Sequence, residues 1–199
     1  MTTIGNPTNE RGETLVLCIA IVLALFAFLA IGFDLPRAIA AKIEQESALD
    51  LAREAEMAPA IGIVAKNSDD PGALVASELV RSLRSSGYGD RIEVWFHEVP
   101  ASELPKNRRV FGYEVILTSD LDPVFARVFG ATNARVASSR VSLSMPYSEM
   151  ETWRPTSART GVYVAQGGSE SITFATKPYA DLPSALRQEL AQGTNHANQ

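Results

Sequence analysis

The longest apolar stretch of the chain runs from Thr14 to Phe33 and contains no charged side chain. As an α-helix this run would be about 30 Å long, which matches the hydrocarbon core of a bilayer. A helix also satisfies its own backbone N–H and C=O groups, as a segment in lipid must. We therefore predict one transmembrane helix at residues 14–33, preceded by a disordered polar tail at residues 1–13.

The segment after this run has the composition of a helix without a strong apolar face. Asp34 is an N-cap type of residue and Pro36 suits a first helical turn, so a new or kinked helix should begin there. Strong helix formers continue to Met57. The apolar positions form only a short stripe, at Ala48, Leu51, Ala52 and Ala55. We predict a juxtamembrane spacer helix at residues 34–58 and no coiled coil.

From residue 59 the pattern changes to short apolar and alternating segments, which predict a domain of strands and helices at residues 59–192. Strands are expected at residues 61–65, 91–99, 110–118, 141–145, 161–166 and 171–176. Helices are expected at residues 71–86, 123–129 and 184–191, with a polar tail at residues 193–199. Gly87 should end the first of these helices in a left-handed conformation.

The order of these elements predicts the sheet. The strand, helix and strand between residues 61 and 99 suit a right-handed parallel βαβ unit. The last two strands flank Gly167–Glu170, which suits an antiparallel hairpin. The expected fold class is therefore α/β: a single transmembrane helix, a spacer helix and one mixed-sheet, sandwich-like α/β domain.

Composition restricts the function. The net charge is -5 and the basic residues form no stripe, so we expect no nucleic-acid partner. Cys18 is the only cysteine and lies in the apolar run, while the two histidines are His97 and His196, so an ordinary zinc site is not expected. No nucleotide-binding or catalytic motif is present. We expect no cofactor and no enzymatic activity.

Four carboxylates are the candidate ligands for a metal. Asp69 and Asp70 follow the first predicted strand, and Asp120 and Asp122 follow the third. If these strands are neighbours in an open sheet, the four acids could bind Mg²⁺ or Ca²⁺. The favoured interpretation is helix capping, because Asp70 and Asp122 each precede a proline at a predicted helix start.

Three stretches of the domain resemble a response-regulator receiver domain: residues 61–71, 115–123 and 174–179. The resemblance implies a doubly wound sheet, an acidic pair that binds magnesium, a phosphoacceptor aspartate and a lysine before a proline. On this analogy the site would comprise Asp69, Asp70, Asp120 and Lys177. Ser119 takes the acceptor position when the chains are aligned on Pro123. The alternative function is therefore a degenerate receiver-like, cation-binding or phosphoacceptor domain on the cytoplasmic side.

Small side chains recur along the predicted span. Ala20, Ala24 and Ala27 share one helical face, which would let a second membrane helix approach closely. Besides the lipid bilayer, the expected partner is therefore another membrane protein or a second copy of the chain. The competing interpretation is that alanine is simply common in such spans.

The flanking charges say little about orientation, because Arg11 stands before the run and Arg37 and Lys42 stand after it. A short tail before a long apolar run is typical of an uncleaved signal anchor, so we expect a cytoplasmic amino terminus and a periplasmic domain at a bacterial inner membrane. Cleavage after Ala40 is the alternative. The expected function is a noncatalytic binding or assembly domain held at the membrane.

Overall fold

The computed structural model describes residues 7–56, 64–65, 67–88, 90–105, 109–144, 159–167 and 171–197. The chain divides into two compact units. The first combines Met1–Ala41 with Asp120–Val136, and the second combines Lys42–Ser119 with Ala137–Gln199.

In the first unit the apolar run lies in one long helical stretch. Helix α1 (Pro7–Leu29) continues through a π-helical turn, η1 (Ala30–Asp34), into α2 (Leu35–Glu56). The backbone N–H of Leu35 bonds to the Ala30 carbonyl, five residues earlier. This wide turn lies directly before Pro36, which cannot donate a backbone hydrogen bond. The helix continues through this turn, so no new helix begins at Asp34 as the sequence suggested.

The helix begins earlier than expected. The sequence predicted a disordered tail at residues 1–13, whereas residues 7–13 are helical. By length and composition the stretch Gly12–Ala55 could cross a membrane, and none of its most apolar window is buried in the structure.

The second unit is built on a five-stranded sheet in the order β3-β2-β1-β4-β5. Its strands are β1 (Arg91–Glu98), β2 (Phe111–Leu121), β3 (Ala134–Leu143), β4 (Thr160–Gln166) and β5 (Ile172–Thr176). Strands β1 and β2, β1 and β4, and β4 and β5 pair antiparallel. The predicted antiparallel pairing of the last two strands is confirmed, and residues 168–170 of the expected turn lie outside the described part of the chain.

The predicted parallel βαβ unit is wrong. Val64 and Ala65, the described residues of the expected first strand, are helical, and residues 61–63 lie outside the described part of the chain. The described sheet pairings are antiparallel, so the doubly wound parallel sheet implied by the receiver resemblance is absent from them. A run such as Ile61–Ala65 is too short for periodicity to distinguish strand from helix.

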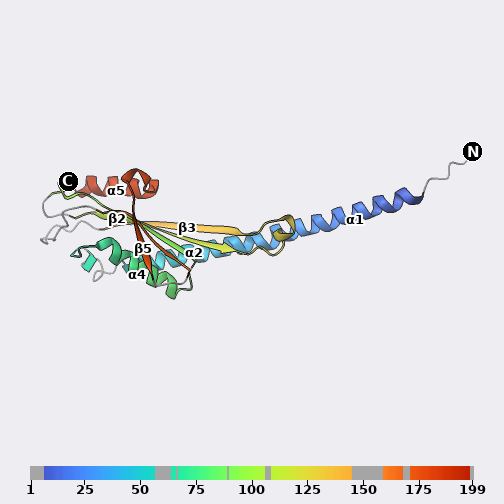
Figure 1. Cartoon of the computed structure of the whole chain (residues 1–199), viewed down its shortest axis with the longest axis horizontal. Coiled ribbons are helices and arrows are strands. Elements are labelled where there is room, and N and C mark those ends of the chain that lie inside the picture. Colours follow the sequence, from blue (N-terminus) through green and yellow to red (C-terminus); the bar gives the residue numbers. More distant parts are fainter. Residues whose placement is uncertain are drawn as a thin grey trace, which may run out of the picture. The chain divides into compact units, whose positions relative to one another are not determined.

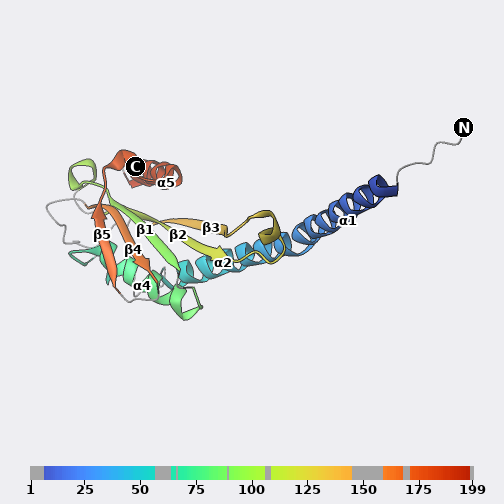
Figure 2. The same ribbon diagram turned by 45° about the vertical axis from the view of Figure 1, so that its right-hand side comes forward.

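Helices cover both faces of the sheet, as Figures 1 and 2 show. Helix α4 (Pro71–Ser85) and the second half of α2 pack on one face, and α5 (Ser184–Ala197) packs on the other. The predicted α/β fold class, with its long apolar helix, is therefore confirmed. Gly87 ends α4 with φ +92°, as predicted.

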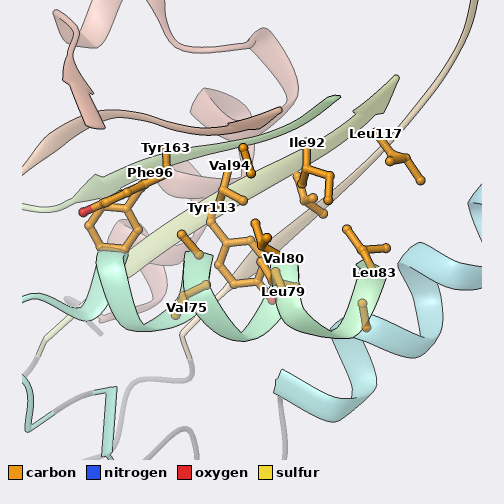
Figure 3. Close-up of a cluster of buried hydrophobic side chains, with 14 of the residues drawn as sticks. Val75, Leu79, Val80, Leu83, Ile92, Val94, Phe96, Tyr113, Leu117 and Tyr163 are labelled. Carbon is orange, nitrogen blue, oxygen red and sulfur yellow. The ribbon is translucent and has the colours of Figure 1, made fainter. Parts of the chain in front are cut away.

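The larger core lies between α4 and the sheet (Figure 3). Val75, Leu79 and Leu83 recur along one face of α4 and are fully buried. They pack with alternate side chains of the central strands, including Val94 and Tyr113. The spacing of the buried positions, about one helical turn on α4 and two residues on the strands, matches the periodicity of each element.

Helix α2 is part of this core. Gln45, Leu49 and Ala52 are at most 1% exposed, whereas Leu51 is 60% exposed. Of the predicted stripe, Ala52 is buried and Ala48 packs against the core, whereas Leu51 and Ala55 are exposed. The buried face includes a polar residue, Gln45, whose side-chain carbonyl accepts a hydrogen bond from the Ser138 hydroxyl at 3.2 Å.

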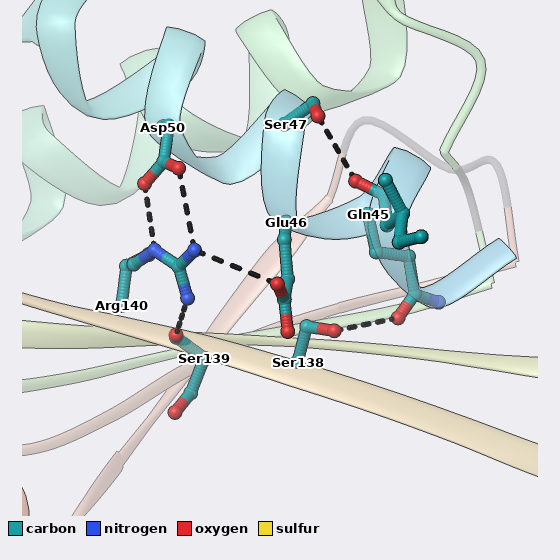
Figure 4. Close-up of polar contacts among 8 residues, drawn as sticks. Gln45, Glu46, Ser47, Asp50, Ser138, Ser139 and Arg140 are labelled. Carbon is teal, nitrogen blue, oxygen red and sulfur yellow. Dashed lines mark hydrogen bonds and ion pairs between the residues drawn. The ribbon is translucent and has the colours of Figure 1, made fainter. Parts of the chain in front are cut away.

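A salt bridge fixes the same part of α2 to β3 (Figure 4). Arg140 donates to both carboxylate oxygens of Asp50, at 2.6 and 3.2 Å, and lies 3.9 Å from Glu46. The hydrogen bond from Arg140 lowers the pKa of Asp50. The predicted spacer helix is therefore attached to the sheet by its second half.

Candidate functional site

Asp70 caps the first turn of α4, as the sequence predicted. Its Oδ1 accepts hydrogen bonds from the backbone N–H of Ala73 and the hydroxyl of Tyr163, each at 3.0 Å. Its Oδ2 forms an ion pair with Arg159. Burial and the charge of Asp70 raise the pKa of Tyr163, which keeps the phenol a neutral donor. The neighbouring Asp69 is exposed.

Asp120 and Asp122 belong to the first unit, and each lies near an arginine. Asp120 Oδ1 accepts a hydrogen bond from Arg135 Nε at 3.3 Å. Asp122 Oδ1 lies 3.8 Å from Arg127 Nη2. All four side chains are more than half exposed, so solvent screens both pairs.

These arrangements do not form a recognisable metal centre. Within the described ranges, no three His, Cys, Asp or Glu side chains are grouped so that they could hold a metal ion. Asp70 acts as a helix cap, and Asp120 and Asp122 lie beside arginines. The four-carboxylate cation site stays a prediction. Lys177 donates its backbone N–H to the Thr160 carbonyl at 3.1 Å.

The predicted membrane-packing residues lie on α1. Ala20 and Ala24 are exposed, and Ala27 is half-buried. Their spacing of four and three residues leaves small side chains on one helical face. Their role in helix packing stays a prediction.

The segment after β2 differs from its prediction. The helix expected at residues 123–129 is the shorter 3₁₀ helix η3 (Ala126–Phe129), which ends at Gly130 with φ +84°. Asp122 is not its N-cap, because the helix starts four residues later and has no side-chain cap of its own. The backbone donors before η3 bond to Asp34 instead.

Asp34, which the sequence suggested as a helix N-cap, instead accepts hydrogen bonds from a distant segment. Its Oδ1 accepts a hydrogen bond from the Val124 N–H at 3.0 Å. Its Oδ2 accepts hydrogen bonds from the N–H groups of Phe125 at 2.9 Å and Ala126 at 2.8 Å. The side chain thus satisfies three consecutive donors that lie 90 to 92 residues away in sequence. In the sequence, the one sign of this role is that Asp34 is an acid placed directly after an apolar run.

Aromatic side chains extend this attachment along α1. The ring of Phe125 lies 5.6 Å from that of Phe33, edge to face, and 6.4 Å from that of Phe26. Arg37 donates to the Asp122 carbonyl at 3.5 Å and lies over the Phe33 ring at 6.0 Å. The segment between β2 and β3 is therefore fixed to the end of the apolar run by both polar and apolar contacts.

A cleft of about 460 Å³ lies between the end of β1 and α5. It is lined by His97, Val99, Pro100, Glu103, Tyr179, Leu190, Ala191, Thr194 and Asn195. Mostly apolar walls with a few polar groups are typical of sites that bind small ligands or short peptide segments.

His97 is the buried polar group of this cleft. Its side chain is 8% exposed, and its Nδ1 lies 2.7 Å from the Thr160 hydroxyl. The Tyr179 ring packs against the imidazole with 4.8 Å between centroids. Burial lowers the pKa of His97 from 6.5 to about 4. The imidazole is therefore neutral at pH 7 and suited to hydrogen bonding in the cleft.

Comparisons of the chain with protein-family models, with curated proteins and with solved structures give no match.

Replacing Asp34 with Asn should loosen the segment that it holds. An amide cannot accept the three hydrogen bonds with the strength of a carboxylate, because hydrogen bonds to a charged acceptor are stronger than those to a neutral one. Hydrogen exchange of residues 122–130, measured by mass spectrometry on the full chain in detergent, should accelerate at least about tenfold. Asp122→Asn is the matched control and should leave exchange nearly unchanged. Equal acceleration in both variants would contradict the assigned role of Asp34.

His97 should make the stability of the domain depend on pH. Its pKa is lower in the folded chain than the ordinary 6.5, so its contribution is complete above pH 6.5 and is lost as the pH falls towards 4. Between pH 7 and pH 4 the wild type should lose about 3 kcal/mol more unfolding free energy than His97→Gln. Urea titrations at a series of pH values measure this difference. His196→Gln is the matched control, because this histidine is exposed and does not line the cleft.

Proposed function

We propose that the protein is a single-pass membrane protein whose α1 helix anchors a noncatalytic binding or assembly domain at the membrane surface. The observation that carries the proposal is the exposure of the apolar run. Leu15, Leu25 and Phe28 are 63%, 57% and 73% exposed, although their side chains are among the most apolar in the chain. Lipid around such a helix would remove this surface from water.

The contacts of Asp34 support a retained anchor over a cleaved signal peptide. Cleavage after Ala40 would remove Asp34 together with Phe26 and Phe33. The N–H groups of residues 124–126 would lose their acceptor, and the Phe125 ring would lose both aromatic neighbours. In addition, Ala38 and Ala40 lie within α2.

For the orientation we propose a cytoplasmic amino terminus and a periplasmic α/β domain at a bacterial inner membrane. In this orientation the apolar run acts as an uncleaved signal anchor. The exposed Ala20 and Ala24 would offer a close approach to a helix of another membrane protein or of a second copy.

The binding role is proposed for the cleft beside His97. Its apolar lining, from Val99, Pro100 and Leu190, is accompanied by a neutral imidazole and by the polar groups of Thr194 and Asn195. This combination favours recognition through shape and a few hydrogen bonds.

Two reporter fusions at Gln199 test the anchoring and its orientation. The alkaline phosphatase fusion should be active, because this enzyme folds only outside the cytoplasm. The green fluorescent protein fusion should not fluoresce, because green fluorescent protein does not fluoresce after export in the unfolded state. Both fusions should stay in the membrane pellet after alkaline carbonate extraction, with the intact mass of the full chain. Fluorescence of the green fluorescent protein fusion would indicate the opposite orientation. A soluble chain that begins at Ala41 would refute the proposed anchor.

A substitution in the cleft tests the binding role. Asn195→Arg should place a long charged side chain at the cleft wall and reduce the partner recovered after crosslinking and purification in mild detergent several-fold. Gln188→Arg is the control, because this exposed residue lies on the same helix but does not line the cleft. Equal recovery from both variants, with unchanged urea midpoints, would place the binding surface elsewhere.

A further inference from the structure

The segment between β2 and β3 presents apolar side chains to its surroundings. Val124, Val128 and Phe129 are 52%, 51% and 51% exposed. They are gathered within six residues, on a segment that contains η3 and ends at Gly130. Apolar exposure of this kind in a short segment indicates a surface that contacts something other than water.

The position of Phe125 gives the level of this segment along α1. Its ring contacts those of Phe26 and Phe33, both of which belong to the apolar run. Phe26 lies seven residues before Phe33, which is about 10 Å along a helix axis. Figure 2 shows the segment beside the helix near the α1–α2 junction. If the run spans the bilayer, the segment therefore lies at the level of its final turns.

The backbone of the segment has the partners that this environment requires. Irregular backbone in contact with lipid is costly unless its polar groups are satisfied by protein. Asp34 accepts from three consecutive N–H groups. The next turn is closed internally, since the N–H groups of Val128 and Gly130 bond to the carbonyls of Phe125 and Arg127 at 3.2 and 3.0 Å.

Charged groups stand at the margin of the same segment. Arg37 and Arg127 are 47% and 64% exposed, and each lies within 4 Å of a carboxylate, Asp34 and Asp122 respectively. Long arginine side chains can extend to the phosphate groups of lipids while their aliphatic parts remain in the apolar zone. An apolar tip with arginines beside it is typical of segments that lie in the membrane interface.

We propose that residues 122–130 form a second membrane contact, an interfacial loop that inserts Val124, Val128 and Phe129 among lipid headgroups and upper acyl chains. The inference rests on the proposed anchoring by α1. The occupant of the apolar surface is lipid, because the surface is continuous with the run that the bilayer would surround. The loop would then fix the depth of the anchor, with Asp34 at the boundary.

Fluorescent labels at single cysteines test this insertion. The full chain with Cys18→Ser is reconstituted in vesicles of phosphatidylcholine and phosphatidylglycerol, and carries an environment-sensitive label at Phe129→Cys. Leu25→Cys reports the span, and Gln188→Cys reports a residue that is exposed on α5. Lipids with a nitroxide near the headgroup quench labels in the interface, whereas aqueous iodide quenches labels in water.

The emission of the label at residue 129 should be shifted to the blue, and the shallow nitroxide lipid should quench it strongly. Iodide should quench it several-fold less than it quenches the label at residue 188. Adding Asp34→Asn should raise the quenching of the label at residue 129 by iodide. Quenching by iodide to the extent seen at Gln188 would overturn the proposal, as would shielding from both quenchers, which would indicate a protein partner. If iodide quenches the labels at residues 25 and 129 alike, the proposed anchoring fails. If iodide quenches the label at residue 129 but not the one at residue 25, the anchoring stands and the interfacial loop is refuted.

Discussion

The interaction on which the first unit depends is the hydrogen bonding of three backbone N–H groups to Asp34. Backbone donors cost free energy wherever water cannot reach them and no acceptor replaces it. Here a single carboxylate, placed directly after an apolar run, accepts from residues 124, 125 and 126. The aromatic packing of Phe125 against Phe26 and Phe33 becomes possible once this backbone is satisfied. The proposed interfacial loop follows from the same arrangement.

The second unit is held together in a different way, by ordinary burial. Apolar faces of α4 and α5 cover opposite sides of one sheet. A buried ion pair adds to this, since Arg109 donates to both carboxylate oxygens of Glu98 at 2.6 and 3.2 Å and to the Ser68 carbonyl at 2.9 Å. The two side chains are 2% and 6% exposed. This pair connects the chain before β2 with the end of β1 and with the segment that leads to α4.

Local periodicity in the sequence was sufficient for much of the fold. The helix expected at residues 71–86 corresponds to α4, and Asp70 before Pro71 predicted its cap. Whether the strands pair parallel or antiparallel was not predictable in this way. The prediction of a parallel pair depended on reading the short apolar run at residues 61–65 as a strand. The buried face of α2 was missed because Gln45 is polar, and its burial depends on a distant hydroxyl at Ser138. The contacts of Asp34 were missed for the same reason, because its partners are distant in sequence.

The π-helical turn at Ala30–Asp34 has a consequence for the length of the chain. It accommodates one more residue than a regular α-helical turn, so deleting Ala30, Ile31 or Gly32 would restore a continuous α-helix. Because the wide turn takes up the extra residue within about one turn, such a deletion would leave the direction of Asp34 relative to Phe26 nearly unchanged. The carboxylate and Phe26 would still face the same loop. The junction can therefore lose one residue inside the turn and keep these contacts, so the direction of the two side chains matters more here than the number of residues between them.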